Sequence, residues 1–309
     1  MKNKKLEKLE EYYKKAYLIF TTIVIYLFIS IFKNLYYGLY NISLKNLSNI
    51  EQQLATIVYQ IFAISLSMTF LIKHKNDNEE ELKKYIKSFL IGISTIVIYS
   101  LTSFLEILIL MLTKTNIKNM SIAAKSIYLI LFEILIMAII ALINNKLLKD
   151  KFKDFKKNWK KYFEKYLKYY ILALIVMMIS NFIIYSITQT IAGNEQTIEN
   201  TLQQAPIYMF FSAVITAPFI EEMVFRQSIR NIIKDNLTFI IASGLIFGGL
   251  HVIGNINTIY DILYIIPYSA PGIAFAYILS KSDNIFVPMG IHFLHNGLLM
   301  TLQIILLLI

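Results

Sequence analysis

The sequence predicts an all-α fold, a polytopic integral membrane helix bundle with about eight or nine transmembrane helices. Two observations predict it. Hydrophobic residues make up 57% of the 309 residues and charged residues only 16%, whereas about a quarter of a typical soluble domain is charged. Uncharged segments long enough to cross a bilayer as helices also recur along the chain, with lysine-rich segments between them.

Nine candidate spans follow one another. The first, residues 16–32, has no small-residue cleavage pattern after it, so we expect an uncleaved anchor instead of a signal peptide. The sixth begins at Pro206 and runs through a pair of adjacent glutamates. The other seven are residues 54–72, 89–113, 126–143, 169–188, 237–253, 259–280 and 285–309.

The basic residues alternate between two sets of connecting segments. Of the 30 lysines and arginines, 25 lie in the N-terminus and every second connection after it, and 5 lie in the others. The positive-inside rule then predicts a cytoplasmic N-terminus, in what we take to be a bacterial cytoplasmic membrane. A nucleic-acid-binding protein would gather its basic residues on one face, so we expect no nucleic acid partner. The chain has no cysteine, which excludes disulfides, thiolate nucleophiles and cysteine-ligated metals.

A basic segment, residues 144–170, contains ten lysines interleaved with aromatic and aliphatic residues. It is expected to form either an amphipathic helix in the cytoplasmic interface beside anionic lipid or a solvated linker helix. We therefore divide the chain into residues 1–168, an N-terminal half with about four spans and the basic helix, and residues 169–309, a core that holds most of the polar residues suited to chemistry. The two acids inside the N-terminal spans, Glu106 and Glu133, are expected to be structural.

An acid pair marks the core. Glu221 and Glu222 lie in an apolar run, where an uncompensated charge costs roughly 2.5 to 3.5 kcal/mol on insertion scales. Arg226, one of only two arginines, follows Glu222 by four residues, so the two share a helical face and are expected to form an ion pair. Glu221 is rotated by about 100° and is left without that partner.

Other polar residues are expected at the same depth. If the chain turns near Asn236, Glu221 and His251 lie equally far from the turn on antiparallel helices. His292 and Asn296 share a face of the last helix, whereas His295 need not point inward. Such a set suits hydrolysis, because a poorly solvated carboxylate can take a proton from water, an imidazole can hold that water, and a His and Asn can donate to an oxyanion.

At these residues the chain resembles the CPBP family, the CAAX-protease and bacteriocin-processing intramembrane endopeptidases also called Abi or Rce1-like proteins. The family pattern is Glu-Glu-x-x-x-Arg, Phe-x-x-x-His and His-x-x-x-Asn on successive helices. This sequence reads Glu221-Glu222-Met-Val-Phe-Arg226, Phe247-Gly-Gly-Leu-His251 and His292-Phe-Leu-His-Asn296. The similarity covers about residues 205–300, and His295 stands where the family usually has an apolar residue.

The resemblance implies peptide-bond hydrolysis within the membrane, on a hydrophobic or lipidated peptide or protein. It implies that Glu221 is the general base, that His251 positions the water and that His292 and Asn296 form the oxyanion site. Glu222 and Arg226 would organise the pocket. No cofactor is expected on this reading. The family has also been described as zinc-dependent, with ligands that would here be Glu221, Glu222, His251 and His292; the absence of a His-Glu-x-x-His motif and the presence of Arg226 favour the metal-free form.

Two other classes of function stay open from the sequence. A transporter would also bury acidic and basic residues, but it usually carries them in two related repeats, and polar chemistry is concentrated in one half of this chain. A non-catalytic immunity protein that binds a peptide would need no general base. Alanine at Glu221 would leave the function of such a protein intact.

Overall fold

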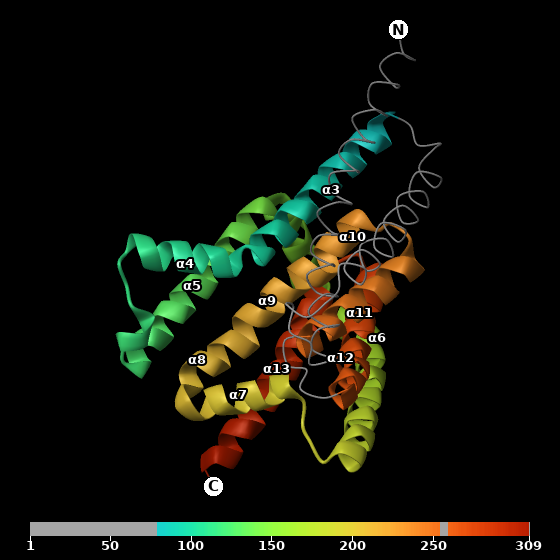
Figure 1. Ribbon diagram of the computed structural model, residues 1–309. Helices are drawn as coiled ribbons and strands as arrows, with labels where there is room; N and C mark the ends of the chain where they lie inside the picture. The colour runs from blue at the N-terminus through green and yellow to red at the C-terminus, as the bar shows by residue number, and fades with distance from the viewer. Residues whose placement is uncertain (1–78, 254–258, 309) are drawn as a thin grey trace, which may run out of the picture. The chain divides into compact units, whose positions relative to one another are not determined.

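The structure is a computed structural model that describes residues 79–253 and 259–308, and the described residues with regular structure are all helical (Figure 1). The chain divides into two compact units, Met1–Leu90 with Ile256–Ile259, and Ile91–Asn255 with Tyr260–Ile309. Of the first unit only residues 79–90 and Ile259 are described. The following description concerns the second unit, which contains every candidate site residue.

The predicted membrane helices are present wherever the chain is described. Six described helices are long and apolar enough to cross a membrane, or up to seven if one bent pair counts as a span. The six are Ile122–Ile143, Asn145–Thr188, Pro206–Ile232, Asn236–Ile253, Tyr260–Ser282 and Phe286–Leu307. The all-α membrane fold is therefore confirmed. The predicted spans 16–32 and 54–72 lie outside the described residues.

The predicted span 89–113 is the bent pair. It consists of α3 (Glu79–Ser100) and α4 (Thr102–Leu112), which are separated at Leu101. On either side of the break a hydroxyl donates back to the preceding turn, Ser100 Oγ to Ile96 O at 2.9 Å and Thr102 Oγ1 to Tyr99 O at 2.7 Å. Back-bonding of this kind bends helices, which accounts for the break.

The basic segment and the span after it form one helix. After η2 (Ile117–Asn119) and α5 (Ile122–Ile143), α6 runs without interruption from Asn145 to Thr188. The predicted boundary between residues 168 and 169 falls inside α6, which is continuous there. The division into an accessory half and a catalytic core therefore has no matching break in the helix and stays a prediction. The C-terminal part of α6 exposes large apolar side chains such as Leu172 and Phe182, as expected of a surface that faces lipid.

The helix that carries the glutamates changes its winding twice. Its segments are, in order, α8 (Pro206–Phe211), the π-helical η3 (Ser212–Thr216), α9 (Ala217–Glu221), the π-helical η4 (Glu222–Ser228) and α10 (Ile229–Ile232). Pro218 accounts for the first change, because its ring clashes with the carbonyl four residues earlier and it has no N–H to donate. In the second, Ser228 Oγ donates to Met223 O, five residues back. Wide turns of this kind occur often at functional sites.

Three further helices surround the glutamate helix. They are α11 (Asn236–Ile253), α12 (Ile265–Ser282, preceded by η5, Ile259–Tyr264) and α13 (Phe286–Leu308), and α7 (Gly193–Gln204) connects α6 to α8. Phe225 contacts α11 twice, because its carbonyl accepts from Ser243 Oγ and its ring packs edge-on against Phe247. These contacts confirm the predicted antiparallel hairpin, and the buried core forms where α5, η4, α11, α12 and α13 meet.

Glycines allow α11 and α12 to approach closely. A Cβ atom on Gly248 would overlap Ser269 Oγ and lie 2.8 Å from the Ser269 backbone nitrogen, and one on Gly244 would lie 2.9 Å from the nitrogen of Ile273. Small residues four apart let membrane helices pack backbone to backbone. This contact fixes the turn of α11 that carries Phe247 and His251.

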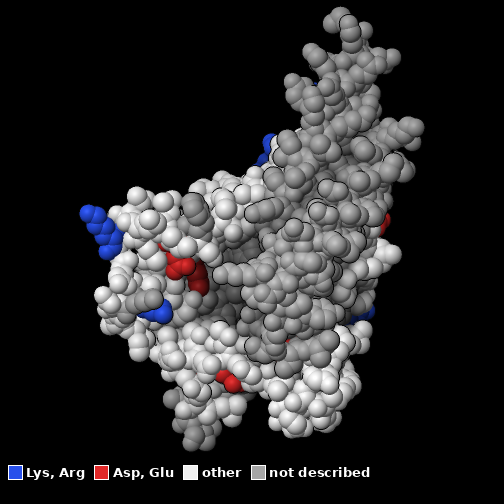
Figure 2. All heavy atoms as spheres, viewed as in Figure 1, with Lys and Arg blue, Asp and Glu red and all other residues white. Residues whose placement is uncertain are grey.

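The described surface carries few charges on the face drawn in Figure 2, where most of it is free of charged side chains.

Candidate active site

Glu222 and Arg226 form the predicted ion pair at the centre of the bundle. Arg226 Nη2 lies 3.4 Å from Glu222 Oε1, and both side chains are completely buried. The guanidinium also lies over two aromatic rings, 4.1 Å from the centre of Phe247 and 5.6 Å from that of Phe275. Among the described residues Arg226 has no hydrogen-bond partner for its guanidinium nitrogens, so the pair and the two rings stabilise its charge.

His292 bridges the two glutamates. Its Nδ1 lies 3.0 Å from Glu222 Oε1, within hydrogen-bond distance, and its Nε2 lies 3.7 Å from Glu221 Oε2. The ring stacks on Phe275, with the ring centres 5.0 Å apart. An imidazole between two carboxylates can donate to both when it is protonated, and two carboxylates, a guanidinium and an imidazolium together carry no net charge.

Glu221 is the accessible member of this group. Its side chain keeps 19% of its surface exposed, whereas that of His292 keeps 6% and those of Glu222 and Arg226 none. A water molecule or a substrate would therefore reach Glu221 before the other acid. The expected division of the pair, with Glu222 held by Arg226 and Glu221 available, agrees with this geometry. The approach of His292 to Glu221 was not expected from the sequence, which left Glu221 without a partner.

His251 stands apart from the two glutamates. Its Nδ1 donates to Phe247 O at 3.0 Å, one turn back on α11, and in the neutral ring this leaves Nε2 as an acceptor. Within the described part of the chain, His251 forms no hydrogen bond or ion pair with Glu221, Glu222 or His292. The ring of Phe247 contacts both imidazoles, with centres 4.4 Å from His251 and 6.3 Å from His292.

A second acid lies on the other side of His251. The ring of Tyr268 stacks on His251 at 4.9 Å, and the Tyr268 hydroxyl donates to Glu195 Oε1 at 3.2 Å. Glu195 is on α7, outside the spanning helices, and burial raises the pKa of its carboxyl above the ordinary value. A cavity of about 10 Å³ adjoins His251 and Tyr268, which is near the lower limit for one water molecule.

Asn296 and His295 point to different neighbours. Asn296 Nδ2 donates to the carbonyl of Ala213 in η3 at 2.7 Å, which uses one of its two N–H groups and leaves the other available. His295 Nδ1 is hydrogen-bonded to the hydroxyl of Tyr170 on α6 at 2.5 Å. His295 therefore contacts α6, away from the acid pair.

Glu133 anchors the start of the glutamate helix. Its carboxylate accepts from three hydroxyls, those of Tyr208 at 3.0 Å, Ser212 at 2.8 Å and Thr216 at 2.5 Å. These donors lie four residues apart, on one face of α8 and η3. The expected structural role for Glu133 fits this arrangement.

Phe275, whose ring stacks on His292, was not among the predicted site residues. An aromatic residue inside an apolar helix carries no signal of its own in the sequence.

A zinc centre would require Glu221, Glu222, His251 and His292 to converge. In the range that the structure describes, no group of three or more His, Asp or Glu side chains is placed to hold a metal ion. Among the described residues, His251 makes no hydrogen bond or ion pair with either glutamate, and the guanidinium of Arg226 lies beside Glu222, where its positive charge would repel a cation. As placed here, these residues do not fit a zinc ion.

Residues 203–298 match the family model of the type II CAAX prenyl endopeptidase Rce1-like proteins. This range contains all three motifs, and the resemblance to that family is confirmed over it. Two bacterial proteins are similar over 143 residues, 41% of this chain. The membrane-embedded CAAX protease MroQ of Staphylococcus aureus (strain USA300) is 32% identical over 54% of its own length. YdiL of Bacillus subtilis (strain 168), provisionally named a membrane peptidase, is 27% identical over 55%.

The matches cover only part of each protein. The chain spans about half the length of these two relatives. Glu195 lies outside the residues matched by the family model, so it is not part of the shared motifs. No solved structure matches the chain.

Proposed function

We propose that this chain is an intramembrane endopeptidase of the CAAX-protease type. It hydrolyses a peptide bond of a hydrophobic or lipidated peptide or protein with a water molecule that a glutamate activates, and it uses no metal. The observation that carries this proposal is the position of His292, whose two ring nitrogens face the adjacent acids Glu221 and Glu222 beside a buried arginine. The match of residues 203–298 to a family of prenyl endopeptidases supports it.

The proposed reaction begins at Glu221, the acid that water can reach. Its carboxylate takes a proton from water while the water oxygen attacks the scissile carbonyl carbon, so a tetrahedral oxyanion forms. His251 accepts a hydrogen bond from that water through Nε2, once the water and substrate lie between it and Glu221. The protonated Glu221 then gives its proton to the leaving nitrogen as the carbon–nitrogen bond breaks.

Two donors stabilise the oxyanion in this proposal. The Nδ1–H of a protonated His292 stays on Glu222, which leaves Nε2–H for the oxyanion. Asn296 contributes its second N–H, while its first, on Ala213 O, fixes the direction of the amide. Arg226, 3.4 Å from Glu222, holds that side chain in place, and so acts through Glu222 and His292 and does not touch the substrate.

The experiment is cleavage of membrane peptides by the purified full-length protein. Hydrophobic and prenylated peptides in detergent are incubated with the wild type and with Glu221→Ala, His292→Ala and His295→Asn, and the products are identified by mass spectrometry. We expect the first two variants to lose at least 10²-fold in rate, because each removes a group that acts on the reacting atoms. His295→Asn, a change three residues away that faces α6, is expected to keep most of the activity.

Each rival predicts another result. Unchanged cleavage by Glu221→Ala would contradict the proposal. Loss of wild-type activity with a chelator, restored by zinc, would establish the metal-dependent form of the same protease. Substrate flux into vesicles without cleavage would favour a transporter. A peptide that binds equally to the wild type and to Glu221→Ala, and is never cut, would favour a non-catalytic immunity protein.

A further inference from the structure

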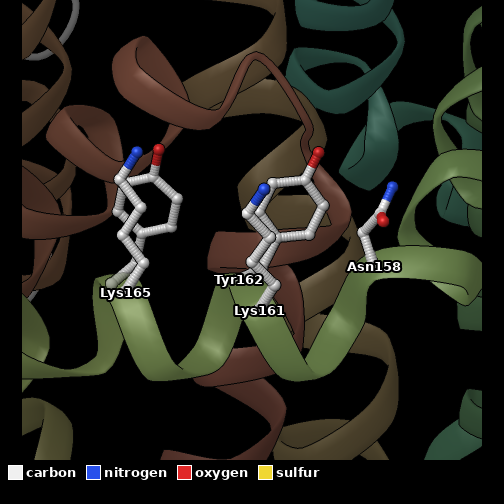
Figure 3. Close-up of a pocket in the computed structure, with 5 residues that line it drawn as sticks. Asn158, Lys161, Tyr162 and Lys165 are labelled. Atoms are coloured by element: carbon white, nitrogen blue, oxygen red, sulfur yellow. The ribbon is translucent and has the colours of Figure 1, made fainter.

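A hollow of about 210 Å³ lies along one side of α6, and none of its lining residues belongs to the candidate active site. Five side chains line it, those of Asn158, Lys161, Tyr162, Lys165 and Tyr166. Figure 3 shows that the four labelled side chains, Asn158, Lys161, Tyr162 and Lys165, project from the same side of the helix. Their spacing of three and four residues explains this, because such residues share one helical face.

The hydrogen-bond donors left available in the hollow suit an anion. The hydroxyls of Tyr162 and Tyr166 are already used, since they donate to Asp154 Oδ2 at 2.6 Å and to Lys281 O at 2.9 Å. Asn158 donates one amide N–H to Asp154 Oδ1 at 2.7 Å and keeps the other. The exposed ammonium groups of Lys161 and Lys165 add two compact positive charges, which are typical phosphate ligands.

An acidic group, Asp154, lies beside the hollow, and neutral donors of the fold occupy its carboxylate oxygens. Asp154 accepts hydrogen bonds from Tyr162 and Asn158 and also from Asn284 Nδ2 at 2.8 Å, in the turn between α12 and α13. Asp154 is therefore held by these three donors and, within the described part of the chain, forms no ion pair with Lys161 or Lys165.

The hollow lies at the level expected for lipid headgroups. Lys168 is the last lysine before the apolar part of α6, and Lys165 and Lys161 precede it by about 5 and 10 Å along the helix axis. The headgroup region of a bilayer extends roughly 5 to 8 Å beyond the hydrocarbon on each side, so the backbone of Lys165 falls within it. The backbone of Lys161 lies just beyond it, and the long side chain of this lysine can extend into it. Tyr169, beside Lys168, packs on Tyr277 of α12 at the same level, as aromatic residues do at a membrane interface.

We propose that this hollow binds the phosphate of an anionic membrane lipid, with Lys161, Lys165 and the free N–H of Asn158 as its donors. The cation–π contact of Lys165 with the ring of Tyr166, at 5.2 Å, holds one ammonium at the edge of the hollow. The whole basic segment, residues 144–170, carries ten lysines against three acids and attracts anionic lipid generally. The hollow adds one defined position on α6 where a headgroup is retained. This site is independent of the proposed peptidase activity.

The test is lipid binding by the full-length protein in a neutral detergent, followed by native mass spectrometry. Dioleoyl phosphatidylglycerol and dioleoyl phosphatidylcholine are titrated against the wild type, against Lys161→Ala with Lys165→Ala, and against Lys149→Ala with Lys156→Ala. The second pair removes the same charge from the same helix on the face opposite the hollow. We expect the first pair to weaken phosphatidylglycerol binding about 10- to 30-fold and the second pair less than about threefold. Unchanged melting temperatures show that the variants are folded.

Three results would overturn the proposal. Equal losses for the two lysine pairs would show that the lipid responds only to the general charge of α6. Equal affinity of the wild type for phosphatidylcholine and phosphatidylglycerol would show that anionic lipid is not selected. Displacement of the lipid by millimolar inorganic phosphate would assign the hollow to a soluble phosphate instead of a membrane lipid.

Discussion

At the scale of single residues, the candidate active site pairs opposite charges inside the helix bundle, where little water is available to solvate them. Glu222 and Arg226 are completely buried, and each would be costly alone. His292 connects this pair to Glu221, whose side chain keeps some exposure. One imidazole thereby holds the buried acid and reaches toward the accessible one, which is why we place the reacting water at Glu221.

We expect that lysine cannot replace Arg226 without loss of stability. Arg226→Lys loses the planar group that lies 4.1 Å from the centre of the Phe247 ring and cannot keep the same distance to Glu222. We expect a loss of about 1 to 3 kcal/mol in stability, measured as a shift of the denaturation midpoint in detergent.

The other arginine provides the control. Arg230 is half-buried, donates to Lys234 O at 2.9 Å and lies 5.3 Å from the centre of the Phe239 ring. Arg230→Lys is expected to cost less than about 1 kcal/mol, because its head is partly solvated. Equal losses at the two positions would argue against a special role for the buried pair.

At the scale of helices, close packing and wide turns position these side chains. Pro218 and the two π-helical segments turn the glutamate helix so that Glu222, Arg226 and Ser228 face inward together. Gly244 and Gly248 bring α11 against α12, and this contact sets the position of Phe247, whose ring packs against both His251 and His292.

Adjacent glycines on α11 should respond in opposite directions. Gly248→Ala places a Cβ atom against the backbone of Ser269, and we expect a loss of about 1 to 3 kcal/mol from overpacking. Gly249→Ala meets only Ile253 Cδ1 at 3.7 Å and is expected to gain about 0.5 to 1 kcal/mol, because alanine favours the helix. Thermal unfolding of both variants in detergent measures the difference. Similar effects at the two positions would refute the close approach of α11 and α12.

Glu195 on α7 should make stability depend on pH. Burial raises the pKa of its carboxyl above 4.5 in the folded protein, so the fold favours the protonated form. That contribution is complete at pH values below the unfolded pKa and is lost as the pH rises through the folded pKa. The melting temperature of the wild type should therefore fall over this range, and Glu195→Gln should remove that fall. Glu199→Gln, one turn later on α7, should retain it, and a fall that persists in Glu195→Gln would exclude this group as its source.

At the scale of the whole molecule, the distribution of lysines predicts how the chain lies in the membrane. The ten lysines of residues 144–170 are predicted to be cytoplasmic, and the connection through α7, which has no lysine or arginine, is predicted to be on the other side. The peptidase site would then lie between these two levels.

The absence of cysteine allows a direct measurement of this topology. Single cysteines are introduced by Lys157→Cys on α6 and Gln196→Cys on α7, at two exposed positions, and are labelled in intact cells with a membrane-impermeant thiol reagent. We expect label on Gln196→Cys in intact cells and on Lys157→Cys only after the cells are opened. Labelling of both in intact cells would contradict the predicted orientation.

The sequence by itself determined the membrane class, the approximate positions of the described spans and the pairing of Glu222 with Arg226. These are local features: long apolar segments, lysine-rich connections and the spacing from Glu222 to Arg226. They can be recognised in the sequence without knowledge of tertiary contacts. The tertiary structure decided which partners these residues take. His292 contacts both glutamates, His251 packs on Phe247 and Tyr268, and His295 bonds to Tyr170. These directions depend on how α6, α11 and α13 rotate against the glutamate helix. Those rotations are set by packing at residues such as Gly248 and Phe275, whose roles arise only from their neighbours in space.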